Sequence, residues 1–243
     1  MRKLMKKWSG EKSGLAANAD RVYRYERKFL EDQIDAHQVR MLLRLHPALF
    51  SETYPPRYVN NIYLDTSELD CYYENIHGME KRRKVRIRWY GDLFGIIPKP
   101  ILEFKNKDGV VGIKESYPIS TFTFNQHFCC AYLQQVMDGS DLPLDIRYSL
   151  RDLEPVLVNR YYRWYYASVD GYFRVTVDTA MCFFNVQRLQ NSFLYHLHDN
   201  HNVVVELKYD AQYEVGAGRI AHRFPFTVTK NSKYVQGIER VYV

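Results

Sequence analysis

Long apolar runs are missing from this sequence, and no window approaches the roughly 18 consecutive apolar residues that a membrane-crossing helix requires. The basic residues near the N-terminus are followed by no apolar stretch, so a signal peptide is not expected. Internal repeats and low-complexity linkers are also missing. These absences predict a cytoplasmic protein that reaches a membrane only from its surface or through a partner protein.

Cysteine is scarce, and its spacing excludes two further classes of protein. The four cysteines are Cys71, Cys129, Cys130 and Cys182. No two of them have the CxxC spacing of common zinc sites, and two are adjacent. The pattern therefore matches neither a zinc module nor the disulfide framework of a small secreted domain, and it favours a reducing compartment.

The composition is that of a globular protein with a moderate excess of positive charge. Hydrophobic residues make up 46% of the 243 positions and charged residues 26%, which is ordinary for a globular domain. Aromatic residues reach 15%, with 21 tyrosines, and favour strands. The net charge of +6 indicates an anionic partner such as a phosphorylated compound, a membrane surface or nucleic acid.

Residue periodicity predicts an α+β domain dominated by antiparallel hairpins. We expect a flexible basic leader over residues 1–19 and one domain over 20–243. Strands are predicted over 21–30, 58–65, 81–90, 98–109, 110–119 and 201–210, with a further hairpin around Val169-Asp170-Gly171. Helices are predicted over 35–47, 66–78, 121–138, 143–151 and 232–240, the first capped by Asp35.

A row of cations is the most unusual feature of the predicted strands. Residues two apart share one face of a strand. In the segment Lys81–Tyr90 the two faces are therefore Arg82, Lys84, Arg86 and Arg88 on one side, and Arg83, Val85, Ile87 and Trp89 on the other. Like charges in a row repel, so the row requires an anion or a wet surface.

Other strands repeat this division between a charged and an apolar face. The charged faces carry Arg24, Glu26 and Lys28; Glu103, Lys105 and Lys107; Lys114; Tyr161 and Arg163; Arg174, Thr176 and Asp178; and Glu206 and Lys208. For one strand, a solvated surface is the simplest interpretation. Repetition over six or more strands favours a curled sheet whose interior holds water and a polyanion, because unpaired interior charge is costly. Carboxylates among the cations suggest Mg²⁺ or Mn²⁺, which take oxygen ligands and bridge phosphates.

An ordered set of motifs resembles the VTC domain of vacuolar transporter chaperone polyphosphate polymerases and their free-standing bacterial relatives. The motifs are RYERKF, RRKVRIRWYG, LEFKNKDG, RYYRWYY, FRVTVDT, VVVELKY and KNSKYVQGI, spread over about residues 20–240. This group is part of the triphosphate tunnel metalloenzyme (CYTH-like) superfamily. The resemblance implies a closed antiparallel eight-stranded β-tunnel with basic residues inside and helices packed outside.

Motif by motif, the resemblance also implies site residues. Those similar to the catalytic phosphate-binding residues are Lys28, Arg86, Arg88, Lys105, Arg163, Arg174 and Lys233. Further substrate-binding candidates are Lys107, Lys114, Tyr161, Lys230 and Ser232, together with Arg82 and Lys84 from the cationic row. Glu206 resembles the carboxylate that holds the catalytic Mn²⁺ or Mg²⁺, and Glu26 and Glu103 are secondary metal candidates. The superfamily has the pattern Glu-x-Glu-x-Lys, and this chain has Arg24 in place of the first Glu. This difference fits the polymerase branch better than the triphosphatases.

The expected activity is polymerisation of inorganic polyphosphate from the γ-phosphate of ATP, with release of ADP. Two alternatives stay open: a metal-dependent triphosphatase acting on inorganic or nucleoside triphosphate, and a non-catalytic module that binds polyphosphate or inositol phosphate. Nucleic acid is not expected as a partner, because the tyrosines are more simply strand residues. ATP and polyphosphate are the expected ligands, and association with a membrane partner protein is compatible with the sequence.

Three histidines lie close together in the sequence, at His196, His198 and His201. The first two could share one face of a strand. No neighbouring cysteine or carboxylate completes a metal site with them in the sequence, so a solvated loop is the simplest expectation.

Overall fold

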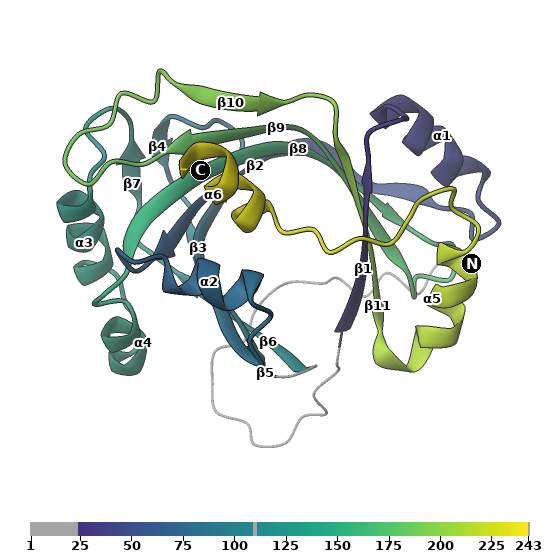
Figure 1. Cartoon of the computed structure of the whole chain (residues 1–243), viewed down its shortest axis with the longest axis horizontal. Helices are drawn as coiled ribbons and strands as arrows, with labels where there is room; N and C mark the ends of the chain where they lie inside the picture. The colour runs from purple at the N-terminus through teal and green to yellow at the C-terminus, as the bar shows by residue number, and fades with distance from the viewer. Residues whose placement is uncertain (1–23, 109–110, 243) are drawn as a thin grey trace, which may run out of the picture.

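The computed structural model describes residues 24–108 and 111–242, and the expected leader over 1–19 lies outside them (Figure 1). The strands are β1 (Arg24–Glu31), β2 (Ser51–Asp65), β3 (Lys81–Tyr90), β4 (Gly95–Ile97), β5 (Ile101–Asp108), β6 (Val111–Pro118), β7 (Phe122–Phe124), β8 (Glu154–Ala167), β9 (Arg174–Asn185), β10 (His196–Asp199) and β11 (Val203–Asp210). The α-helices are α1 (Ala36–Leu45), α2 (Asp70–Ile76), α3 (Cys130–Asp138), α4 (Leu144–Ser149), α5 (Glu214–Ala221) and α6 (Lys233–Tyr242).

Nine of the described strands form one antiparallel sheet. Eight of them follow the order β1-β11-β9-β8-β2-β3-β5-β6, and β10 pairs separately with β9. The sheet arches strongly, and side chains approach one another across it: Lys105 Nζ on β5, the strand next to the end strand β6, lies 3.7 Å from Glu26 Oε1 on the other end strand, β1. Eight strands on one curved path confirm the α+β tunnel fold that the sequence predicted. The expectation that the helices pack outside holds for α1, α3, α4 and α5 and is wrong for α2 and α6, which pack on the concave side.

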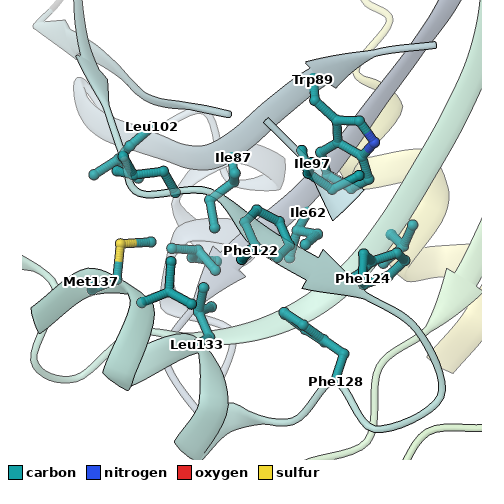
Figure 2. Packing of buried hydrophobic residues seen from close by; sticks show 14 of the residues in the cluster. Ile62, Ile87, Trp89, Ile97, Leu102, Phe122, Phe124, Phe128, Leu133 and Met137 are labelled. Carbon is teal, nitrogen blue, oxygen red and sulfur yellow. The ribbon is translucent and has the colours of Figure 1, made fainter. Parts of the chain in front are cut away.

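The convex face of the sheet is apolar and is covered by helices in two places. Under α3, α4 and the small β4–β7 sheet, the core contains Ile87 and Trp89 from β3 together with Leu133 and Met137 from α3 (Figure 2). A second core, under α1 and α5, contains Val175 and Val177 of β9. Burial of these side chains drives the charged face of each strand inward, since neighbouring strand residues point to opposite faces.

The strand β3 follows the sequence prediction residue by residue. Val85, Ile87 and Trp89 are almost fully buried, whereas Arg86 and Arg88 on the other face reach the concave side of the sheet. The helix α1 is also as predicted, because Asp35 caps it and the Gln38 side chain accepts a hydrogen bond from the Asp35 backbone N–H.

The helix predicted over residues 121–138 is wrong in its first half. Residues 122–124 form the strand β7, which pairs with β4, and α3 begins only at Cys130. Phe122 and Phe124 are buried in the core beside α3. Tertiary packing of two aromatic rings therefore decided this segment. No described helix is long and apolar enough to span a membrane.

Like α2, the helix α6 packs on the concave side, and it lies against β8 and β9 (Figure 1). Its Gly237 makes this approach possible: a Cβ at this position would collide with Leu157 and lie 2.8 Å from Cδ1 of Phe183. The first residue of α6 is Lys233, so the close packing of α6 at Gly237 brings Lys233 to the concave face.

We expect Gly237→Ala to destabilise the protein by about 1–3 kcal/mol through overpacking. The matched change Gly218→Ala in α5 should be neutral or stabilising by about 0.4–1 kcal/mol, because the nearest neighbour of a Cβ there is Arg27 Nη2 at 3.8 Å. Chemical denaturation of both variants measures the difference. Equal stabilities would mean that α6 does not pack closely on β8 and β9.

Candidate functional site

The concave face of the sheet gathers charged side chains from seven strands and from α6. This set, here called the interior cluster, comprises the cations Lys28, Lys84, Arg86, Arg88, Lys105, Lys114, Arg163, Lys208 and Lys233 and the carboxylates Glu26, Glu103, Asp178 and Glu206. The cations clearly outnumber the carboxylates. The cluster joins residues from β1 to α6 that are far apart in the sequence.

The most deeply buried part of the interior cluster is centred on Asp178. Its two carboxylate oxygens accept hydrogen bonds from Nε and Nη2 of Arg163 at 2.5 and 2.6 Å. Lys233 Nζ lies 2.6 Å from Oδ2. Burial alone would raise the pKa of Asp178, but Arg163 and Lys233 lower it. Asp178 therefore stays ionised and orients two cations that the sequence had assigned to the site.

Glu206 lies beside this group and is held more loosely. Its Oε2 is 2.7 Å from Lys208 Nζ and 3.7 Å from Arg163 Nη2. Its Oε1 is 3.6 Å from Lys233 Nζ and 3.9 Å from Lys28 Nζ. Burial acts to raise the pKa of Glu206, but the surrounding cations, Lys208 foremost, hold it well below its usual range. Glu206 is thus an ionised carboxylate with one oxygen that makes only long contacts.

A second group is built around Glu103 on β5. Arg86 Nη2 contacts its Oε2 at 2.6 Å, and Lys114 Nζ contacts its Oε1 at 2.5 Å, so both oxygens are closely paired. Arg88 donates to Asn61 Oδ1 at 2.9 Å and to the Tyr161 hydroxyl at 3.1 Å. The side chains of Lys105 and Lys114 are 46% and 48% exposed, so water reaches this part of the concave face.

The phenol of Tyr161 lies among the cations. Arg163 and Lys233 lie 5.0 and 4.9 Å from its ring centre, and Arg88 donates to its oxygen. Burial raises its pKa, but Arg163 and Arg88 outweigh burial, and the net pKa is lowered. Tyr161 therefore positions three of the predicted site residues.

The segment before α6 brings further polar groups to the cluster. Ser232 Oγ accepts a hydrogen bond from Val235 N at 3.3 Å, and it also lies 2.8 Å from Lys84 Nζ. Lys28 Nζ donates to the carbonyl of Asn231 at 3.0 Å. The Tyr234 hydroxyl donates to the buried carboxylate of Asp65, which also accepts from backbone N–H groups of α2. These contacts fix the start of α6 at the interior cluster.

Four of the predicted site residues lie at the margin of the interior cluster. Arg82 donates to the carbonyl of Met79, and Arg82 and Lys107 line a pocket that also contains Arg83 and Glu74. Lys230 is exposed. Arg174, at the first position of β9, is also exposed and is directly opposite Lys208 of the cluster. The structure thus brings Lys28, Lys105, Arg163 and the other cations named above together, and it leaves these four at the margin.

Asp178 and Asn61 were not among the predicted site residues. Asp178 stood on a charged strand face in the sequence, but its partner Arg163 lies directly opposite it only because of the β8–β9 register. Asn61 is fully buried and faces Arg88 across the β2–β3 pair. The motif FRVTVDT contained the signal for Asp178, whereas nothing in the sequence distinguished Asn61 from Asn60.

The VTC domain family matches this chain over residues 23–242, which is nearly its whole length. The chain therefore belongs to the VTC domain family. No curated protein matches it closely enough to report.

Solved structures resemble this chain at low identity. A candidate adenylate cyclase from Bacillus halodurans is 12% identical, with a TM-score of 0.51 over 91% of this chain and 98% of that one. A candidate adenylyl cyclase from Hippeastrum, described as having a dominant triphosphatase activity, is 12% identical, with a TM-score of 0.49 over 90% and 98% of the two chains. At such identity the likeness concerns the fold alone.

Proposed function

We propose that this protein polymerises inorganic polyphosphate by transferring the γ-phosphate of ATP to a growing chain and releasing ADP. Membership of the VTC domain family supports the broader statement of a metal-dependent activity on triphosphate-type substrates. The observation that carries the proposal is the excess of cations over carboxylates on one water-accessible concave face. Such a face is suited to a flexible polyanion.

The cations of the interior cluster suit phosphoryl transfer. Arginine offers a planar pair of donors to two phosphate oxygens, and lysine offers a mobile point charge. Phosphoryl transfer depends on positioning and charge neutralisation more than on covalent catalysis. Arg86 and Arg88 are held by Glu103, Asn61 and Tyr161, so their donors are oriented before a substrate binds.

The donor set fits Mg²⁺ or Mn²⁺ at Glu206. These ions commonly bind one or two carboxylates and complete their shell with substrate phosphates and water. Glu103 and Asp178 have both oxygens within 2.6 Å of cationic nitrogens, whereas Glu206 Oε1 has none closer than 3.6 Å. Glu206 is therefore more able than Glu103 or Asp178 to turn to a metal. Glu26 is a neighbour through Lys28 and is also loosely paired, with Lys28 Nζ at 3.2 Å from its Oε1. When bound, the metal would neutralise charge on the phosphates and the leaving group.

The acceptor in this proposal needs no strong base. The terminal phosphate of a polyphosphate chain is already an anionic nucleophile. The residues of this chain hold it in line with the ATP γ-phosphate and offset the repulsion between them. Lys233 would contact the reacting phosphates from the start of α6, where the backbone N–H groups also favour an anion.

Product analysis tests the proposal directly. The purified protein is incubated with ATP and with Mn²⁺ or Mg²⁺, and the products are separated by gel electrophoresis and assayed for free phosphate. We expect long-chain polyphosphate and ADP. Release of free phosphate alone would identify a triphosphatase instead. Absence of ATP turnover, with neither product formed, would leave a binding module as the function.

The pH dependence of phosphate binding gives a further prediction. Burial, with the charges of Lys28 and Lys105, lowers the pKa of Lys84 to about 7. Lys84 therefore loses its charge as the pH rises through about 7, and the affinity for inorganic triphosphate should fall between about pH 6 and 8.5. Lys84→Arg stays charged throughout and should show a flatter profile.

The lowered pKa of Lys84 also makes the stability of the folded protein depend on pH. The pKa of Lys84 in the folded protein lies below its usual 10.5. Between about pH 7 and 10.5 the unfolded chain therefore binds more protons than the folded protein, and the contribution of Lys84 to stability rises with pH.

Calorimetric titration of triphosphate into the wild type and Lys84→Arg checks the prediction on phosphate binding. Identical profiles for the two proteins would contradict it.

A further inference from the structure

Three potential metal ligands lie together on the convex side of β9, apart from the interior cluster. They are Cys182 on β9 and His196 and His198 on β10, and their ligand atoms all lie within 4.8 Å of one another. The register of the two strands explains the grouping, because His198 is directly opposite Cys182 and His196 is opposite Phe184. Side chains at directly opposed positions share a face of the sheet.

This group is separate from the proposed phosphate site. Cys182 packs in the apolar core of the convex face, with Phe184 and Val158. Its neighbours Met181 and Phe183 point to the other face and pack beneath α6. The thickness of the sheet therefore lies between Cys182 and the interior cluster.

The two imidazoles are already partly oriented. The ring of His196 stacks on Phe184, with ring centres 4.9 Å apart, and the His198 ring lies 4.5 Å from it at 75°. Nδ1 of His196 is 3.2 Å from the carbonyl oxygen of Leu194. A proton on Nδ1 would make this hydrogen bond and leave Nε2 free as a ligand, which is the usual arrangement of histidines that bind metals.

We propose that Cys182, His196 and His198 bind a divalent transition metal of the zinc class, with a fourth position open to water or an external ligand. One thiolate and two imidazoles form a nitrogen–sulfur set that suits zinc and does not suit the oxygen-seeking ions proposed at Glu206. Two of the ligands are exposed, so a metal can enter from solvent.

Only small side-chain movements are needed to complete this site. Zinc bonds of about 2.0–2.3 Å in a tetrahedron place the ligand atoms roughly 3.3–3.8 Å apart. The present spread of up to 4.8 Å closes by rotation of the exposed imidazoles. Burial raises the pKa of the Cys182 thiol to about 11, so the thiol keeps its proton until a cation displaces it.

A bound metal would cross-link β10 to β9. The next residue of β10, Asp199, pairs with Arg240 of α6 at 2.8 Å. The metal would therefore add to the contacts that hold β10 near α6, the helix that begins with Lys233. Thermal stability of the whole chain should rise when the metal binds, because only the folded protein brings the three ligands together.

Cobalt provides the test, because a Co²⁺–thiolate bond gives a near-ultraviolet charge-transfer band that oxygen and nitrogen ligands do not give. The full chain is stripped with a chelator, titrated with Co²⁺, and back-titrated with Zn²⁺. We expect one equivalent of Co²⁺ with the thiolate band, displaced by Zn²⁺, and a higher melting temperature with Zn²⁺. Cys182→Ser should remove the band, and His196→Asn or His198→Asn should weaken binding by at least about 10–100-fold.

Two matched controls test another histidine and another cysteine of the chain. His201→Asn removes an exposed histidine two residues after β10, and Cys129→Ser removes a partly buried thiol elsewhere, so neither should alter the titration. The histidine variants change exposed side chains and keep the fold testable if Cys182→Ser is unstable. A titration without the thiolate band, or one unchanged by His196→Asn and His198→Asn, would overturn the proposal. Binding that is lost only in Glu206→Gln would assign the metal to the interior cluster and overturn it as well.

Discussion

Glu206→Gln should lower polyphosphate synthesis by about 100-fold or more, which corresponds to about 2.7 kcal/mol or more in the transition state. Glutamine keeps the size of the side chain but loses the charge that a divalent metal requires. The half-saturating concentration of Mn²⁺ or Mg²⁺ should rise in this variant, together with the fall in the rate of synthesis. The change also removes the carboxylate that pairs with Lys208 and one of the two carboxylates near Lys233, so the melting temperature should fall and activity should be assayed well below it.

Glu103→Gln is the matched control for this prediction. Glu103 is as deeply buried, but its oxygens are occupied by Arg86 and Lys114. Its loss should reduce activity by disturbing these cations while leaving the half-saturating metal concentration unchanged. A Glu206→Gln enzyme with normal turnover and normal metal dependence would place the metal elsewhere. The products formed by the wild-type protein test the polymerase proposal separately, so a misplaced metal site can be told apart from a wrong assignment of the activity.

Arg88→Ala should cost about 2–4 kcal/mol of transition-state stabilisation, since it removes a preorganised charged donor from phosphates in a partly desolvated site. The Arg88 side chain is only 11% exposed and is oriented by Asn61 and Tyr161. Arg83→Ala removes the same charge from the opposite face of β3, where the Arg83 backbone N–H donates to Glu74 of α2. It should cost less than about 1 kcal/mol.

Ionic strength separates a site effect from general attraction. A surface field acts alike on both variants and weakens with salt, because exposed charges are screened over about 10 Å at 0.1 M salt. A direct contact affects Arg88→Ala alone and persists. Synthesis of polyphosphate from ATP is measured for both variants at low and moderate salt. Equal losses that disappear with salt would mean that the cationic row of β3 acts only as a surface attraction.

Local patterns in the sequence were sufficient for much of the fold. Alternation in β3 predicted which side chains face the core, and the structure confirms it at Val85, Ile87 and Trp89. The side chain of Asp35 caps α1 as its position predicted. Both signals depend on residues close in the chain, where the strand period and the cap geometry operate. The segment 122–124 was mispredicted because its conformation depends on β4 and on a shared aromatic core.

The sequence by itself determined that the apolar faces of many strands would turn outward beneath helices and that their cationic faces would turn inward. Only the tertiary structure decided which charges meet. Asp178 pairs with both Arg163 and Lys233 through the β8–β9 register and the close approach of α6 at Gly237. Cys182 likewise joins His196 and His198 only because β10 pairs with β9. Periodicity specifies the face on which a side chain lies, whereas contacts between distant segments depend on register and packing, which arise when the whole sheet forms.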